Sequence, residues 1–177
     1  RQRQMCIRDS DTTVPVTVDD VVYHSNNVAK GLSRAFLIAD MPFMSYSDPN
    51  QALENSVRLM QEGGAMMIKL GGGEDQISIV EHLARHDIAV CAHLGLKPQS
   101  VHKIGGFKVQ GRDKGESDKM LKNAISLQNA GADLILLECV PNELGKSIRD
   151  KLDIPVIGIG AGPNVDGQIL VLYDVLG

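Results

Sequence analysis

Four titratable side chains share one position in the sequence, at or beside the end of a short apolar run. They are Asp40, Lys69, His93 and Glu138. Such runs are typical of buried parallel strands, where an ionised carboxylate is costly unless a cation or hydrogen bonds compensate it. Because the carboxyl ends of parallel strands converge on one edge of a sheet or one mouth of a barrel, we expect the four side chains to share a site.

The types of these residues suit proton transfer beside a charged group. Glu138 ends the run LILLE, and we expect it to be buried by its strand yet directed at the shared mouth. There Lys69 or a metal ion would compensate its charge and tune its pKa. Each residue also has a plainer interpretation, with Asp40 or Glu138 as a helix cap, Lys69 as a structural counter-ion and His93 as a buried histidine beneath a loop. The occurrence of four titratable residues at strand ends favours a functional site over four separate structural roles.

Five apolar runs predict the strands that would position these residues. They cover residues 35–40, 65–70, 88–93, 133–138 and 155–160. A helical pattern separates each run from the next. The alternation predicts an α/β fold with a parallel sheet built from right-handed βαβ units.

The helical patterns share apolar residues at three- and four-residue spacing. The clearest begins at Pro49, after the N-cap candidates Ser47 and Asp48, and ends at a glycine pair. Its expected inner face is Leu53, Val57 and Met60; the later patterns contain Ile79, Val80 and Leu83, then Leu121, Ala124 and Ile125, then Leu144, Ile148 and Leu152. The connection at residues 94–116 is long, polar and glycine-rich, which favours a functional loop.

Length and composition limit the class of protein. A chain of 177 residues, 43% hydrophobic and 23% charged, fits about one globular domain with a real core. A net charge of -4 provides no basic field for nucleic acid, and no apolar stretch reaches the roughly 20 residues of a membrane-spanning helix. The three cysteines lack CxxC spacing and indicate neither a disulfide framework nor a zinc site. We therefore expect a cytoplasmic protein with a small-molecule partner and no nucleic acid or membrane partner.

Three short motifs imitate known sites without the features that those sites need. His82 and His86 have i, i+4 spacing but lack the second-position glutamate of HExxH, so an exposed helix face is the better interpretation. The GKS at 145–147 lacks the upstream glycine of a P-loop and lies in a helical pattern. The GIGAG at 158–162 lacks GxGxxG spacing; it and the GGG at 71–73 are interpreted as loops that bring backbone close to a ligand.

An ordered series of motifs resembles the ketopantoate hydroxymethyltransferase family. The motifs are DTTVPVTV (11–18), LIADMPFMSY (37–46), MIKLGGGE (67–74), CAHLGLKPQSV (91–101), GGFKVQGR (105–112), LLECVP (136–141), IPVIGIGAG (154–162) and DGQILVLYD (166–174). The resemblance implies a (β/α)8 TIM barrel. It also implies transfer of a hydroxymethyl group from 5,10-methylenetetrahydrofolate to 3-methyl-2-oxobutanoate, which gives 2-dehydropantoate for pantothenate biosynthesis.

The resemblance assigns roles to the residues at the strand ends. Glu138 matches the family's proton acceptor, Asp40 a residue that binds both Mg²⁺ and the keto acid, and Lys69 a residue that binds the keto acid. Mg²⁺ chelated by the keto acid would stabilise the enolate as it forms. His93 lies in a family motif near the substrate, and its role is left open. The implied partners are the keto acid and the folate, and a homo-oligomer is expected.

The sequence departs from the family pattern near the lysine and before Asp11. The family motif KxEGG has a glutamate where this chain has Gly71, and Glu74 lies three residues further on. The family's Asp-Ser pair on an earlier strand would precede Asp11. We therefore expect residues 11–177 to form a partial catalytic barrel that lacks its N-terminal strands, and residues 1–10 to be non-native or unstructured. The chain on its own is expected to be weakly stable and inactive.

Two other interpretations stay open. One is a different phosphoenolpyruvate/pyruvate-type barrel, an aldolase or lyase, which the change at Gly71 would permit. The other is an inactive truncated copy of the enzyme. The segment ILVLYD at 169–174 is compatible with either a last strand or a helix.

Overall fold

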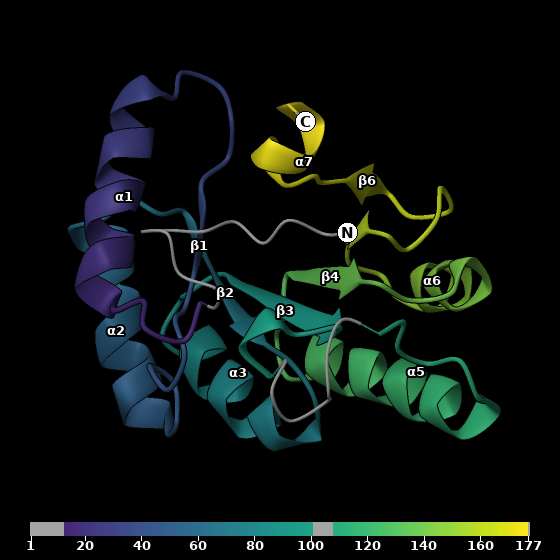
Figure 1. Ribbon diagram of the computed structural model, residues 1–177. Coiled ribbons are helices and arrows are strands. Elements are labelled where there is room, and N and C mark those ends of the chain that lie inside the picture. The colour runs from purple at the N-terminus through teal and green to yellow at the C-terminus, as the bar shows by residue number, and fades with distance from the viewer. Residues whose placement is uncertain (1–12, 101–107, 177) are drawn as a thin grey trace.

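The structure, a computed structural model, describes residues 13–100 and 108–176, in which strands and helices alternate (Figure 1). The strands are β1 (Ile38–Asp40), β2 (Met67–Gly71), β3 (Val90–Gly95), β4 (Leu134–Glu138), β5 (Val156–Ile159) and β6 (Gly167–Gln168). The helices are α1 (Val18–Gly31), α2 (Pro49–Gln61), α3 (Ile77–Ala84), α5 (Lys114–Asn129), α6 (Asn142–Arg149) and α7 (Leu172–Leu176), with 3-10 turns η2 (Glu74–Gln76) and η3 (Pro98–Ser100). The expectation for residues 1–10 and part of the GGFKVQGR motif lie outside the described residues.

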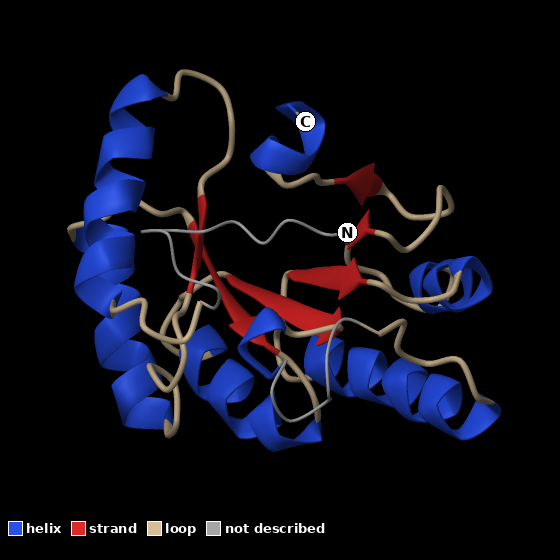
Figure 2. Ribbon diagram, viewed as in Figure 1, coloured by secondary structure: helices blue, strands red, loops and turns tan. Residues whose placement is uncertain are grey.

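The strands form one six-stranded parallel sheet in the order β1-β2-β3-β4-β5-β6. The sheet curls, and α1, α2, α3, α5 and α6 line its outer side (Figure 2). Neighbours in sequence are neighbours in the sheet, which is the winding of a barrel; a doubly wound sheet reverses its strand order. Within the described residues β1 and β6 each pair on one side only. The predicted incomplete (β/α)8 barrel is therefore confirmed as the fold class.

Local capping explains where two of the helices begin. The Asp48 carboxylate accepts hydrogen bonds from the backbone N–H groups of Asn50 and Gln51, and Pro49 occupies the first turn, as predicted. Helix α1 was not predicted from the apolar pattern. Its start carries a capping box in which the side chain of Thr17 and the third helical residue exchange hydrogen bonds with each other's backbone N–H groups.

The main core lies between the sheet and the outer helices. Alternate strand residues point outward, among them Ile68, Leu70, Ile135 and Leu137, all fully buried. Helix α3 contributes Ile79, Val80 and Leu83 to this core, as predicted. The expected inner face of α2 was partly wrong, because Ala52, Ser56 and Leu59 are buried whereas Val57 is exposed. More than one face of α2 has apolar residues at helical spacing. The face that packs against the core includes the small residues Ala52 and Ser56.

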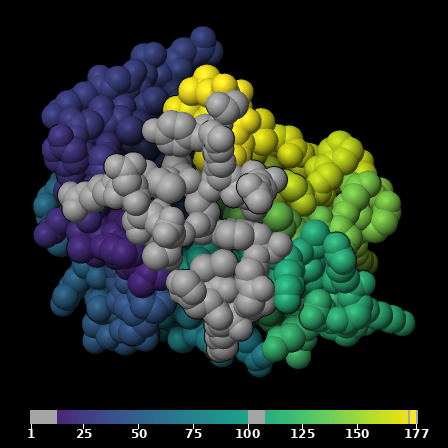
Figure 3. All heavy atoms as spheres, viewed as in Figure 1, coloured from purple at the N-terminus to yellow at the C-terminus, as the bar shows by residue number. Residues whose placement is uncertain are grey.

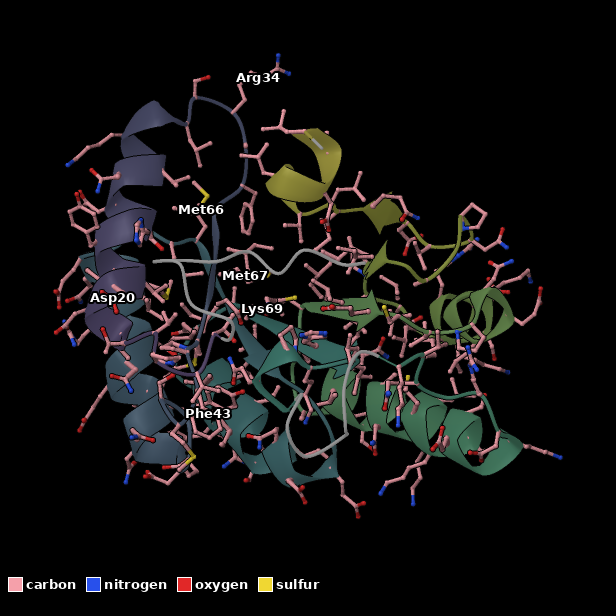
Figure 4. The ribbon with its side chains drawn as sticks, viewed as in Figure 1. Asp20, Arg34, Phe43, Met66, Met67 and Lys69 are labelled. Carbon is pink, nitrogen blue, oxygen red and sulfur yellow. The ribbon has the colours of Figure 1, made fainter. Side chains whose placement is uncertain are left out.

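The concave side of the sheet carries a smaller apolar cluster. Met67, Cys91 and Leu136 form its centre, with strand residues of β1, β4 and β5 packed against them. Figure 4 shows Met67 and Lys69 on the side of β2 that faces away from α3 and α5. In the space-filling view, α1 and the C-terminal segment form the upper part of the molecule (Figure 3). The polar strand-end residues lie next to this inner cluster, nearer the carboxyl ends of the strands.

The predicted strands are confirmed, with ends that differ from the prediction by at most three residues. The segment 169–174, left open between strand and helix, begins as coil and enters α7. The two-residue β6 was not predicted, because a strand this short leaves no apolar pattern. The described residues include no helix long and apolar enough to cross a membrane.

Candidate active site

The four predicted residues lie at the carboxyl end of the sheet, on four neighbouring strands. Asp40 of β1 is in register with Lys69 of β2, and Glu138 of β4 is in register with Gly95 of β3. The Lys69 ammonium Nζ lies 2.6 Å from Asp40 Oδ2, and the two side chains are 19% and 54% exposed. In this ion pair the Lys69 ammonium group is largely buried, whereas solvent can reach the Asp40 carboxylate.

The second pair is more deeply buried. His93 Nε2 lies 3.4 Å from Glu138 Oε2, with the side chains 4% and 12% exposed. Burial lowers the pKa of His93 well below its ordinary value, and the positive charges of Lys69 and Lys97 lower it further. A hydrogen bond with the backbone of Leu96 acts in the opposite direction. His93 is therefore neutral at physiological pH.

Glu138 has the acid–base properties that a proton acceptor needs. Burial raises the pKa of its carboxyl group from an ordinary 4.5 to about 7; the cation of Lys69 lowers this pKa and the anion of Asp40 raises it. A general base is most effective when its pKa lies near the working pH, because it is then both available and basic. The buried strand end explains why LILLE ends in a glutamate.

Backbone geometry fixes the end of β4. The Leu96 N–H donates to the Glu138 carbonyl over 2.9 Å, and the Gln110 N–H donates to the Cys139 carbonyl over 2.9 Å. Gly95 has φ +93, and a Cβ there would lie 2.1 Å from the Glu138 carbonyl oxygen, so only glycine fits. This contact holds the chain that leaves β3 against the residue proposed as base.

A polar network that sequence reasoning missed connects β2 to the loops after β1 and β3. The Tyr46 hydroxyl accepts a hydrogen bond from the Gly71 N–H over 3.3 Å and donates to Gln99 Oε1 over 2.9 Å. Gln99 Nε2 in turn donates to the Met41 carbonyl over 2.7 Å. Burial raises the pKa of Tyr46, so its hydroxyl stays protonated. Both side chains lie in quoted motifs, LIADMPFMSY and CAHLGLKPQSV, but their spacing gave no sign that they meet.

The described residues do not fit a metal centre built by the protein alone. No group of three or more His, Cys, Asp or Glu side chains that could hold a metal ion occurs in residues 13–100 and 108–176. Asp40 offers one carboxylate of the hard oxygen type that Mg²⁺ prefers, but Lys69 already lies against it. At the position of the expected glutamate, Gly71 has no side chain, and the ends of Tyr46 and Lys97 lie near it.

The motifs set aside in the sequence fit their plainer interpretations only in part. His82 lies on α3 and is half-buried, whereas His86 lies beyond the end of α3 and is exposed, with its Nδ1 2.8 Å from the His82 carbonyl oxygen. The expected exposed helix face was therefore only partly right. The GKS at 145–147 is inside α6. The GIGAG at 158–162 leaves β5 through Gly160 and Gly162, which have φ +63 and +80. Of these motifs the GIGAG borders the site, because its Ile159 is in register with Glu138.

Parallel strands in consecutive order define a TIM-barrel chain. Its strand ends carry a carboxyl group with a pKa of about 7 and a lysine, which are candidates for acid–base chemistry. The ketopantoate hydroxymethyltransferase family matches residues 3–177. The chain belongs to this family, and the resemblance drawn from the motifs is confirmed.

Curated relatives agree with the family match. The 3-methyl-2-oxobutanoate hydroxymethyltransferase of Nitrosococcus oceani is 57% identical over 98% of this chain and 66% of its own length. That of Alkalilimnicola ehrlichii is 59% identical over 98% of this chain and 62% of its own length. The chain thus spans slightly less than two thirds of the length of these relatives.

Solved structures support the fold independently of sequence. Phosphonopyruvate hydrolase superposes with a TM-score of 0.66 at 13% identity, covering 93% of this chain and 63% of that one. At this identity the likeness concerns the fold alone.

Proposed function

We propose that the chain is the larger part of a 3-methyl-2-oxobutanoate hydroxymethyltransferase, which adds the one-carbon unit of 5,10-methylenetetrahydrofolate to 3-methyl-2-oxobutanoate and forms 2-dehydropantoate. Relatives that are 57% and 59% identical carry the name of this enzyme. The observation that carries the proposal is Glu138, a buried carboxyl group with a pKa of about 7 beside the Lys69 and Asp40 pair. The reaction needs such a base, because a C–H bond next to a ketone must break.

The proposed first step is proton transfer from C3 of the keto acid to Glu138. The C3–H bond breaks, an O–H bond forms on the carboxylate, and the released electron pair becomes the enolate. Lys69 is 19% exposed and close enough to Glu138 to lower the pKa of its carboxyl group, so its positive charge suits the keto acid's carboxylate and the developing enolate. The enolate carbon then forms a C–C bond to the methylene carbon of the folate. The two C–N bonds of that carbon break, tetrahydrofolate leaves with the electron pairs on its protonated nitrogens, and water supplies the hydroxyl oxygen.

Three parts of the proposal rest on the family resemblance. They are the folate donor, the use of Mg²⁺ and assembly into a homo-oligomer in the cytoplasm. For Mg²⁺ the described residues supply the Asp40 carboxylate, and the keto acid and water would have to supply the remaining ligands. These parts stay predictions.

Hydrogen–deuterium exchange at C3 of 3-methyl-2-oxobutanoate in D₂O tests the proton transfer without the folate. The full-length protein that contains this chain is compared with its Glu138→Gln variant, and exposed Glu143→Gln on α6 is the matched control. We expect exchange in the parent and in the control, and a fall of about 10²–10⁴-fold in Glu138→Gln. Equal exchange in both variants would remove Glu138 as the base.

A substrate panel addresses the other interpretations. A full-length protein that folds, leaves this keto acid unexchanged and exchanges another 2-oxo acid would be a different barrel aldolase or lyase. One that folds and exchanges no 2-oxo acid would be an inactive copy. The 177-residue chain measured in parallel tests the expectation that it is inactive by itself.

A further inference from the structure

The contact between His93 and Glu138 has a feature that the proposed proton transfer does not use. Nε2 of His93 is buried and has no hydrogen-bond partner among the described residues that meets bonding geometry, although Glu138 Oε2 lies only 3.4 Å away. A buried nitrogen without a hydrogen bond costs free energy, so a native structure that keeps one there needs a reason. The protonated form of Glu138 would supply the missing hydrogen bond.

We propose that His93 is a positioning residue whose Nε2 accepts a hydrogen bond from the protonated carboxyl group of Glu138. The inference rests on the proposed function, because it concerns the state of Glu138 after it has taken the substrate proton. In that state the new O–H points at Nε2, which leaves the other carboxyl oxygen toward the mouth. The orphaned nitrogen then has its partner.

The tautomer of His93 follows from its second contact. The hydrogen bond with the backbone of Leu96 raises the pKa of His93, so the ring donates and the Leu96 carbonyl accepts. The Leu96 N–H is already used, since it donates to the Glu138 carbonyl over 2.9 Å. Nε2 faces the Glu138 carboxyl group, so the donor is Nδ1. A neutral ring with its proton on Nδ1 presents a lone pair at Nε2.

The charges around the pair favour this arrangement over an imidazolium–carboxylate pair. Lys69 on β2 and Lys97 beyond β3 both act against a positive charge on His93. Asp40 on β1 acts against a negative charge on Glu138, whereas Lys69 favours it. Both side chains are buried, and burying a charged group costs free energy. A neutral carboxylic acid beside a neutral imidazole is therefore favoured over an ion pair. The lone pair of Nε2 also opposes ionisation of Glu138, which makes the carboxylate a stronger base.

The proton balance of the proposed step stays simple. The proton leaves C3 and bonds to the Glu138 oxygen that faces the mouth, while the electron pair stays on the enolate. Rotation of the carboxyl group about its Cγ–Cδ bond then brings the new O–H to His93 Nε2, where it donates a hydrogen bond. In D₂O the same O–H exchanges with solvent, and deuterium returns to C3. His93 contacts neither carbon nor oxygen of the substrate in this scheme, since its side chain is 4% exposed.

The first test is the tautomer itself, read from the imidazole ¹⁵N shifts of the full-length protein, with exposed His24 as an internal reference. We expect Nδ1 protonated and Nε2 unprotonated in His93 at pH 6. A His93 ring that carries its proton on Nε2 at pH 6 would overturn the proposal. This measurement needs no turnover, so it decides the inference even if the proposed reaction is absent.

The second test is the pH profile of C3 exchange in His93→Gln, with His24→Gln as control. Glutamine presents an N–H donor where histidine presents a lone pair, so it favours the ionised carboxylate. We expect the acid limb of the profile to move about one pH unit lower in His93→Gln, a tenfold change in proton affinity, and to stay fixed in the control. A lower rate with an unmoved acid limb would mean that His93 has a structural role only. If the parent shows no exchange at C3, the proposed function is rejected. The ¹⁵N measurement of the His93 tautomer would then still test the role of His93.

Discussion

The two faces of the same strands have opposite characters. On the outer face of β2 and β4, Leu70 and Leu137 are fully buried against helices. On the inner face of the same strands, Lys69 and Glu138 carry ionisable groups at the carboxyl end of the sheet. Because side chains alternate along a strand, each functional residue has an apolar core residue as its immediate neighbour in sequence. The outer face supplies the stability that holds the inner face in a conformation it would not favour by itself.

This difference separates two kinds of substitution. Changes on the outer face should alter the free energy of unfolding equally at every pH, since no titratable group is involved. Changes on the inner face should alter activity and its pH dependence, and some should increase stability.

The largest effect is expected for Leu137→Ala on the outer face. Removing a fully buried leucine side chain leaves a cavity between β4 and the helices, and should cost about 2–5 kcal/mol of unfolding free energy. Urea unfolding at pH 5 and pH 8 measures it, with exposed Val57→Ala on α2 as control. A cost that depends strongly on pH would break the separation between the two faces.

The next effect is expected for Lys69→Met on the inner face. The charged contact with the keto acid is lost, which should weaken its binding by about 1.5–3 kcal/mol. The cation also lowers the pKa of Glu138, so its removal should move the acid limb of C3 exchange to higher pH. KM and the exchange profile are compared with Lys146→Met, which breaks a surface pair with Asp150. An unmoved acid limb would show that Lys69 does not act on Glu138.

A third effect concerns the stability of the inner face. Glu138 has a pKa of about 7 in the folded protein and 4.5 ordinarily, so between these values the folded state binds more protons than the unfolded state. Stability therefore falls as pH rises from 4.5 to 7, and the loss is complete above pH 7. Glu138→Gln removes this penalty and should stabilise the protein by about 1–3 kcal/mol at pH 8.

The pH dependence provides the control for this third prediction. At pH 4 the carboxyl group is protonated in both states, and the glutamine variant should then be nearly as stable as the parent. Urea unfolding at both pH values compares them. A variant that is less stable than the parent at pH 8 would contradict the prediction and indicate that the carboxylate is stabilised in the folded state.

The alternation of strands and helices could be predicted because buried strands and amphipathic helices have different apolar periods. The strand-end positions of Glu138 and Lys69 followed from the same pattern, since strand direction fixes where carboxyl ends meet. The missed elements, α1 and β6, lack that signal. Helix α1 begins at a capping box rather than at a strong apolar stripe, and β6 is two residues long.

Contacts between distant loops could not be predicted from sequence. Tyr46 and Gln99 are 53 residues apart and meet only because β1, β2 and β3 are adjacent in the sheet. The pairing of His93 with Glu138 likewise depends on register, which apolar periods do not give to the residue. Burial, which sets the pKa of Glu138, follows from the whole fold and has no local signature.

The smallest effect is expected at Gly71, on the inner face two residues beyond Lys69. With one matched carboxylate among the described residues, Mg²⁺ should bind measurably only when the keto acid is present. Gly71→Glu adds a second carboxylate near Asp40, and calorimetry should show Mg²⁺ affinity rising about tenfold, or about 1.4 kcal/mol.

Gly71→Gln separates charge from size in this last comparison. A Cβ at this position would lie 3.0 Å from the Tyr46 hydroxyl and 3.1 Å from Lys97 Cδ, so either side chain must displace the same neighbours by a few tenths of an ångström. Glutamine should therefore reproduce any loss of stability without the gain in Mg²⁺ affinity, because it adds no negative charge. Equal affinity in both variants would mean that position 71 cannot reach the metal. The inner face would then depend on Asp40 and the substrate alone.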